Sequence, residues 1–322
     1  MILALAGGVG GAKLAAGLAA VLPPQELAIV VNTGDDFEHL GFRISPDIDT
    51  VTYTLAGIAN RELGWGIAGE SWAFMDQIAR IGGESWFRLG DRDLATHVER
   101  TRRLRGGESL TDVTAALATA HGIAHRIVPM ADDPAPTIVH TDEGALAFQD
   151  YFVRRQCAPA LTGLNLAPDV APSAAFSALI DDPALAAVIL CPSNPYLSID
   201  PIFALAGARE RLRARGVPIV AVSPIIGGKA VKGPAAKIMA ELGVPVSSAG
   251  IAAHYGAMLD GLVIDETDRA GADAIIGPRL LITQTIMRSD ADRAQLATDV
   301  IGWLRREWTL DPSDPISGVK KA

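Results

Sequence analysis

The chain has 322 residues, 49% hydrophobic and 20% charged, which is enough to bury a large core in one or two globular domains. A formal charge of −9 repels nucleic acid and anionic membranes, so we expect neither as a partner. Two cysteines are too few for a disulfide framework, which fits a cytoplasmic protein. We expect no secretory signal, because the apolar amino terminus is broken by glycines and lacks a basic stretch. We also expect no membrane span, because no other apolar run is long enough to cross a bilayer.

Short apolar runs bounded by Gly, Pro, Asn or Asp predict buried parallel strands. They lie at residues 2–6, 27–31, 187–191, 219–223 and 262–265. All but the last lead into a loop and then a predicted helix, as in doubly wound sheets. We therefore expect an α/β fold with a doubly wound, mostly parallel, Rossmann-like sheet in a three-layer core.

The middle of the chain has a different pattern. From about residue 60 to 119, charged amphipathic segments end at glycines, as helices do. We expect residues 58–173 to form a mostly helical insertion, or lid, over the site. Residues 1–57 and 174–305 would form the nucleotide-binding core, and residues 306–322 a C-terminal tail.

The first loop that follows a predicted strand is rich in glycine and opens a helix. Backbone amides in such a loop can bind phosphate at the start of the helix. The loop departs from the P-loop pattern and from the dinucleotide fingerprint, whose third glycine is replaced by Lys13. We favour phosphate binding over a tight turn without a ligand. The candidates are Gly7, Gly8, Gly10, Gly11 and Lys13.

Two later loops also follow predicted strands. Ser193 and Asn194 lie between two prolines, where the Asn194 amide could pair with the edge of a base. The alternative is that Asn194 bonds its own backbone. The other loop, at residues 223–239, contains glycines and lysines. Its candidates are Ser223, Gly227, Gly228, Lys229 and Lys232.

Lysine usage supports these loops as phosphate sites. The chain has 22 arginines and 6 lysines, and every internal lysine lies in or just after a glycine-rich loop. A compact ammonium group suits phosphate as a point charge. We take Lys229 as a catalytic candidate, with chance placement of the lysines as the alternative.

Acidic residues gather after the second predicted strand, at Asp35, Asp36, Glu38, Asp47 and Asp49. Beside phosphate-binding loops they would repel a substrate unless a hard cation lies between them, and Mg²⁺ takes one or two carboxylates. Asp35 and Asp49 are the first candidate ligands, followed by Asp36 and Asp47. Asp35 or Asp36 is also a candidate catalytic base. The alternative for Asp47 is a helix cap near residue 48.

Several strings in these regions resemble the 2-phospho-L-lactate transferases of coenzyme F420 biosynthesis, and the likeness runs in order from residue 1 to about 305. The strings are GGVGGAKL (7–14), VVNTGDD (30–36), SPDIDTVTYTLAG (45–57), GWGIAGES (64–71), WFRLGDRDLATHVERT (86–101), CPSNPYLSIDPI (191–202) and SPIIGGKAVKGPAAKIM (223–239).

The resemblance implies transfer of a phosphorylated hydroxy acid from its GDP conjugate to the ribityl hydroxyl of the deazaflavin Fo, with release of GMP. It also implies Mg²⁺ at Asp35 and Asp49 and a homodimer. The deazaflavin ring needs a flat apolar surface, for which tryptophans of the insertion are candidates, although each could belong to the core. The candidate deazaflavin contacts are Asn32, Thr33, Trp65, Trp86 and Arg88, with Trp72 as a further aromatic candidate.

Two other functions are open alternatives. Non-catalytic regulators of gluconeogenesis that bind nucleotide sugars share the fold and the first loop, but they tend to carry Arg where this chain has Asp49. A dinucleotide-dependent reductase is disfavoured by Lys13. The sequence does not distinguish phospholactate, phosphoenolpyruvate and phosphoglycerate donors. We expect Asp49→Asn to abolish turnover and leave the fold intact.

Overall fold

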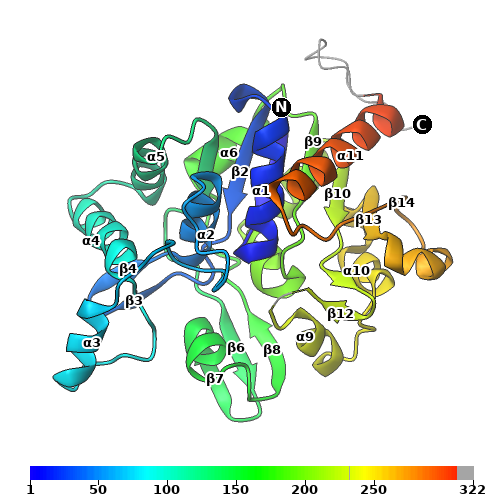
Figure 1. The fold of residues 1–322 in the computed structure, drawn as a ribbon. Helices are drawn as coiled ribbons and strands as arrows, with labels where there is room; N and C mark the ends of the chain where they lie inside the picture. Colours follow the sequence, from blue (N-terminus) through cyan, green and yellow to red (C-terminus); the bar gives the residue numbers. More distant parts are fainter. Residues whose placement is uncertain (232, 310–322) are drawn as a thin grey trace.

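A computed structural model describes residues 1–231 and 233–309 (Figure 1). Lys232 and most of the predicted tail therefore lie outside the described residues. The core is a seven-stranded sheet in the order β14-β13-β10-β9-β1-β2-β5, and every neighbouring pair is parallel. The prediction of a doubly wound, Rossmann-like α/β sheet is confirmed.

The strands of this sheet are short and mostly buried. In β1, Leu3 and Leu5 face one hydrophobic cluster while Ile2, Ala4 and Ala6 face another, so both faces are covered. The bounds of the strands are β1 Ile2–Ala6, β2 Leu27–Val31, β5 Arg126–Pro129, β9 Ala187–Leu190, β10 Ile219–Val222, β13 Gly261–Asp265 and β14 Arg279–Thr283.

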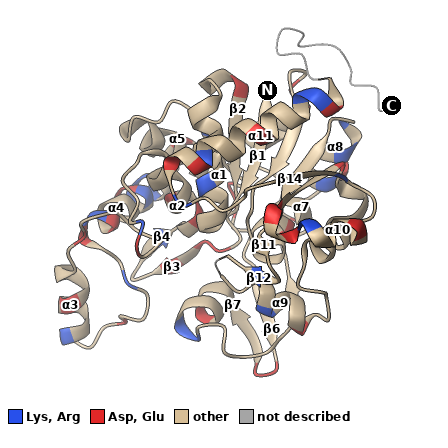
Figure 2. Ribbon diagram, turned by 45° about the vertical axis from the view of Figure 1, so that its right-hand side comes forward, with Lys and Arg blue, Asp and Glu red and all other residues tan. Residues whose placement is uncertain are grey.

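Helices form a layer on each face of the sheet (Figure 1). One layer is built from α1 Gly8–Val21, α2 Pro46–Leu55, α5 Leu110–Ala120 and α11 Asp290–Trp308. The other contains α6 Ala174–Asp181, α7 Asp200–Ala204, α8 Ala208–Ala214, α9 Ala235–Glu241 and α10 Ser248–Tyr255. Lys and Arg are spread over several helices in the view of Figure 2 and do not gather on one continuous face there.

The order of the strands places a topological switch point between β1 and β9. From β1 the chain adds β2 and β5 on one side, and it then returns to add β9, β10, β13 and β14 on the other. The helices that follow β1 and β9 therefore lie on opposite faces of the sheet, and folds of this type bind ligands at the carboxyl edge where this happens.

Residues 58–173, which the sequence predicts to be mostly helical, contain strands as well as helices. They form α3 Ala73–Arg80, α4 Asp91–Arg105 and α5, but they also supply β5 to the main sheet. A three-stranded antiparallel sheet follows, made of β6 Ile138–Thr141, β7 Gly144–Ala147 and β8 Leu161–Asn165. Because these strands have only four or five residues and little apolar alternation, their sequence signal is weak.

Two small hairpins and two π-helical turns complete the elements that border the carboxyl edge of the sheet. The hairpins pair β3 Phe37–His39 with β4 Phe42–Ile44, and β11 Ile225–Ile226 with β12 Lys229–Ala230. The π-helical turns are η2 Asp150–Arg154 and η3 Pro195–Ile199. Within the described part of the chain, no helix combines the length and the hydropathy that crossing a membrane requires.

Candidate active site

A cavity of about 740 Å³ lies at the switch point of the sheet. Its walls include the loops after β1, β2, β9 and β10, the start of α2 and part of α4. Further wall residues are Val231 and residues from the segments 63–66, 86–88, 148–156, 233–235 and 285–288. The prediction that ligands bind at the carboxyl edge therefore has a cavity of suitable size in the expected place.

The first glycine loop is packed tightly against the loop after β9. The amide of Gly7 donates a hydrogen bond to Ser193 Oγ at 3.0 Å. A Cβ atom at Gly10 would overlap the carbonyl oxygen of Pro192, and Gly8 adopts a left-handed φ of 60°. These glycines thus allow two loops to approach each other, in addition to any role of their amides at the start of α1.

The amino terminus of α1 already faces a carboxylate. The Gly8 amide donates to Asp47 Oδ1 at 2.6 Å. The positive end of the α1 dipole favours an anion at this point. Asp47 itself lies in the first turn of α2, where no side-chain cap is formed by Ser45, so the contact joins the two helices rather than capping α2.

Asn32 links the acidic residues at the end of β2. Its Nδ2 atom lies 3.3 Å from Asp35 Oδ1 and 3.0 Å from Asp47 Oδ2, so both carboxylates accept from one amide nitrogen. Asp36 accepts instead from Ser45 Oγ at 2.6 Å, while its Oδ1 is buried without a hydrogen-bond partner. Three carboxylates therefore lie close together in a region with little solvent.

Burial makes the charged form of these carboxylates unfavourable. It raises the pKa of Asp35 well above its usual value, and the negative charges of Asp47 and Asp36 raise it further. Burial likewise raises the pKa of Asp36 to about 8, although Ser45 opposes the shift. The pKa of Asp47 rises to about 6 through burial, against the hydrogen bonds from Asn32 and Gly8. Such shifts mark a site that a cation would stabilise.

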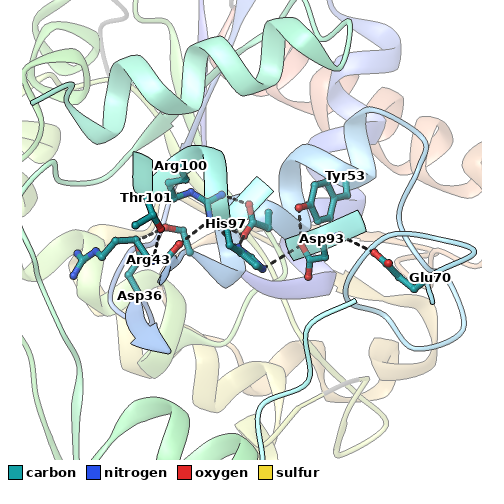
Figure 3. Close-up of polar contacts among 10 residues, drawn as sticks. Asp36, Arg43, Tyr53, Glu70, Asp93, His97, Arg100 and Thr101 are labelled. Atoms are coloured by element: carbon teal, nitrogen blue, oxygen red, sulfur yellow. Dashed lines mark hydrogen bonds and ion pairs between the residues drawn. The ribbon is translucent and has the colours of Figure 1, made fainter. Parts of the chain in front are cut away.

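A second polar network lies on the face of α4 that is buried against the cavity (Figure 3). Arg100 is 1% exposed and donates from Nη1 to Asp49 Oδ2 at 3.0 Å and from Nη2 to Asp49 Oδ1. His97 Nδ1 lies 3.3 Å from the same Nη1 atom. The Asp49 carboxylate is thus held by a buried guanidinium.

Asp93 continues this network along α4. It accepts from the hydroxyl of Tyr53 at 2.6 Å, and His97 Nε2 lies 3.4 Å from its Oδ1 atom (Figure 3). Glu70 accepts from the Asp93 amide at 2.9 Å and so binds the first turn of α4. Asp49, Asp93 and His97 also form a group with metal-ligand spacing, but the guanidinium of Arg100 already balances Asp49.

Most predicted site residues lie in the walls of the cavity. They are Gly7, Gly8, Gly10, Lys13, Asn32, Asp35, Asp49, Trp65, Trp86, Arg88, Ser193, Asn194 and Ser223. Asn194 Oδ1 accepts from the amides of Tyr196 and Leu197, which is the local bonding considered as the alternative. Its Nδ2 atom is nevertheless buried without a partner.

The remaining predicted residues are near the cavity without lining it. They are Gly11, Thr33, Asp36, Trp72, Gly227, Gly228 and Lys229, while Lys232 lies outside the described residues. Gly227 and Gly228 form the turn of the β11–β12 hairpin, with φ values of 57° and 71°. Lys229 is exposed on that hairpin.

Of the internal lysines that the structure describes, one lines the cavity. Lys13 lines the cavity and donates to the carbonyl oxygen of Met287 at 2.9 Å. Lys237 is instead bound by Glu241 and by the carbonyl oxygen of Pro159, away from the cavity walls. A position near a glycine-rich loop is therefore not enough to predict that a lysine lines the cavity.

Sequence reasoning missed several residues of the site. Asp93, His97 and Arg100 are spaced by four and three residues, which places them on one helical face. That face is polar and buried, the reverse of the usual amphipathic helix. Phe148, Gln149 and Phe152 were missed because the short helical turn that carries them has no strong periodic signal.

The raised pKa values predict how stability changes with pH. A carboxyl whose pKa is higher in the folded state binds more protons there, so the free energy of unfolding falls as pH rises from about 4 to about 8. Replacing Asp36 by Asn removes one such group. In urea unfolding with a chelator, Asp36→Asn should gain stability relative to the wild type between pH 5 and pH 8.5, by up to about 5 kcal/mol. A difference that does not change with pH would refute the burial argument.

The parallel sheet with helices on both faces defines a Rossmann-like α/β protein, and sequence comparison identifies the family. The family model of 2-phospho-L-lactate transferase CofD matches residues 2–297. The chain therefore belongs to this family, which is a family of transferases. The resemblance noted in the sequence is confirmed.

Curated relatives agree with this assignment. The chain is 41% identical over 300 residues to a protein of Methanosarcina acetivorans named 2-phospho-L-lactate transferase, with 92% of this chain and 97% of the relative covered. It is 39% identical over 313 residues to a protein of Streptomyces coelicolor named phosphoenolpyruvate transferase, with coverage of 93% and 97%. The two names differ in the group transferred.

A solved structure shares the fold at low sequence identity. Protein BH3568 of Bacillus halodurans, described as a member of the UPF0052 family, aligns with a TM-score of 0.60 and 12% identity. The alignment covers 93% of this chain and 98% of that protein. This similarity supports the α/β architecture alone.

Proposed function

We propose that the protein transfers a phosphorylated hydroxy acid from its GDP conjugate to the terminal ribityl hydroxyl of the deazaflavin Fo in coenzyme F420 biosynthesis. The products would be GMP and coenzyme F420-0 or its dehydro form. The names of the relatives support transfer of a phosphorylated acid. The observation that carries the proposal is the cavity that joins the glycine loop of α1 to a buried group of carboxylates.

The donor would lie over the loops at the switch point. The amides at the start of α1 and the ammonium group of Lys13 would face its diphosphate. The unpartnered Nδ2 atom of Asn194 offers a donor to an oxygen of the nucleotide, and Ser193 and Ser223 line the same region. These positions follow the predicted roles of the loops.

The carboxylates fit a divalent cation. Asp35, Asp47 and Asp49 all line the cavity, and the pKa of Asp35 is raised by burial and further by the charges of Asp47 and Asp36, an effect that a bound cation would oppose. We propose Asp35 as the central Mg²⁺ ligand, with Asp47 as its nearest partner through Asn32. Asp49 is the weaker candidate because both of its oxygens accept from Arg100. When bound, Mg²⁺ would neutralise charge on the phosphate oxygens.

In the proposed reaction, the ribityl oxygen attacks the phosphorus distal to guanosine, and the bond from that phosphorus to the GMP oxygen breaks. The hydroxyl proton passes to a nearby carboxylate and then to solvent. Asp35, which lines the cavity, is the first candidate for this carboxylate, and Asp36 is the second. Asp49 is less suitable because both of its oxygens already accept from Arg100.

The test is product formation by the purified protein. It is incubated with deazaflavin and, in separate reactions, the guanylylated phospholactate, phosphoenolpyruvate and phosphoglycerate conjugates, with Mg²⁺ or with EDTA. We expect GMP and a deazaflavin product of increased mass with at least one donor, only in Mg²⁺. No GMP from any donor would favour the nucleotide-sugar-binding regulator. The homodimer and the cytoplasmic location stay predictions.

A further inference from the structure

A stacked pair of phenylalanines forms part of the cavity wall. The rings of Phe148 and Phe152 are 5.5 Å apart between centroids and inclined by 18°, and both residues line the cavity. Phe152 is 38% exposed. A parallel pair with one ring so exposed leaves an aromatic face open, onto which another flat ring can extend the stack.

The segment that carries this pair has an unusual backbone. Residues 150–154 form a π-helical turn, a conformation that is frequent at functional sites. Shortly after the turn, Gln156 and Cys157 have left-handed φ values of 52° and 56°, which are strained for residues other than glycine. The amides of Arg155 and Cys157 donate to Asp150 O and Tyr151 O at 2.8 and 2.9 Å and hold this geometry.

The spacing turns one side of the segment toward the cavity. Phe148 and Phe152 are four residues apart, as are Gln149 and Val153, and all of them line the cavity together with Gln156. Three of these five side chains are apolar, and two of those are stacked aromatic rings, so the wall can take the face of a large flat ring.

Gln149 connects this wall to the acidic residues. Its side-chain amide donates to the carbonyl oxygen of Asp35 at 3.1 Å. A ring on Phe152 would therefore lie near the loop that carries Asp35, within reach of a flexible polyol chain. Trp86 is also close, because the guanidinium of Arg154 lies 5.8 Å from the centre of its ring.

From these contacts we infer that Phe152, supported by Phe148, is the stacking platform for the fused ring of the acceptor. This inference rests on the proposed function for the identity of the acceptor. Gln149 sets the distance between the ring and the carboxylates, so the ribityl chain crosses from the platform to Asp35. Guanine of the donor binds elsewhere, over the loops after β1 and β9.

The test is calorimetric titration of deazaflavin and, separately, of GDP with Mg²⁺. Phe152→Ala and Phe152→Leu should weaken deazaflavin binding by about 5- to 150-fold, as loss of stacking does for nucleobases. Phe152→Tyr keeps the ring and should bind within about threefold of the wild type. GDP affinity should be unchanged in all three, and Ile81→Ala, an exposed residue outside the cavity, is the matched control.

The outcomes separate this inference from the proposed function. Normal deazaflavin binding by Phe152→Ala and Phe152→Leu would overturn the platform alone. If these variants lost GDP binding but bound deazaflavin normally, the wall would be assigned to guanine, and the inference that Phe152 is the platform would be overturned as well. A wild-type protein that binds GDP but no deazaflavin would refute the proposed function and the platform together.

Discussion

Asp35→Asn is expected to lower turnover by about 10²- to 10⁴-fold and, at the same time, to stabilise the metal-free protein at pH 8. The two effects have one cause. Asp35 is 5% exposed, and its carboxylate lies near Asp47 and Asp36, so its charge is unfavourable without a cation. The amide removes that charge with little change in volume, and it also removes the proposed ligand.

Turnover is measured as GMP release, and stability as the urea midpoint in EDTA at pH 8. Asp133→Asn is the matched control, since Asp133 is exposed and outside the cavity. We expect it to behave as the wild type in both measurements. If Asp35→Asn kept near-normal turnover, the assignment of Asp35 to the reaction would be wrong. If Asp35→Asn were less stable than the wild type in EDTA at pH 8, the proposed repulsion among the buried carboxylates would be wrong.

The second large effect is expected at the buried pair of Arg100 and Asp49. Arg100→Met leaves the Asp49 carboxylate buried without an opposite charge. Asp49→Asn likewise leaves the Arg100 guanidinium buried without an opposite charge. Each single change should lower the free energy of unfolding by about 3–5 kcal/mol. The structure thus replaces the expectation that Asp49→Asn leaves the fold intact, because Arg100 is 1% exposed and its two NH groups depend on Asp49.

A double-mutant cycle measures this coupling. The free energy of unfolding lost in the variant with both changes should be clearly smaller than the sum of the losses in the two single variants, because no unpaired charge remains. Arg102→Met is a control on the same helix, where the exposed Arg102 pairs with Glu99, and it should leave the urea midpoint near that of the wild type. Additive costs in the cycle would show that the pair does not act as a unit.

The core of the fold could be predicted from the sequence where local signals were strong. Strands β1 and β2 begin and end where the apolar runs do, because glycine and asparagine bound them. Strand β5 was missed because its four residues include an exposed Arg126 and end in Pro129. The sheet β6–β8 was missed because its pairing depends on partners distant in sequence, which periodicity cannot show.

The position of the candidate site could be predicted, because the order of the parallel strands determines which loops meet at the carboxyl edge of the sheet. Parallel strands bring the loops after β1, β2, β9 and β10 to one edge, and residues of all four line the cavity. What could not be predicted is the pairing within the site. Arg100 lies 51 residues from Asp49, and only the packing of α4 against α2 shows that this carboxylate is bound.

The most direct measurement is a crystal structure with GDP and Mn²⁺ in place of Mg²⁺, recorded with anomalous scattering. We expect one metal peak in the cavity, at about 2.0–2.2 Å from an oxygen of Asp35 and in contact with a phosphate oxygen of GDP. A nucleotide bound without a metal peak at Asp35, or a metal held only by Asp93 and His97, would contradict it.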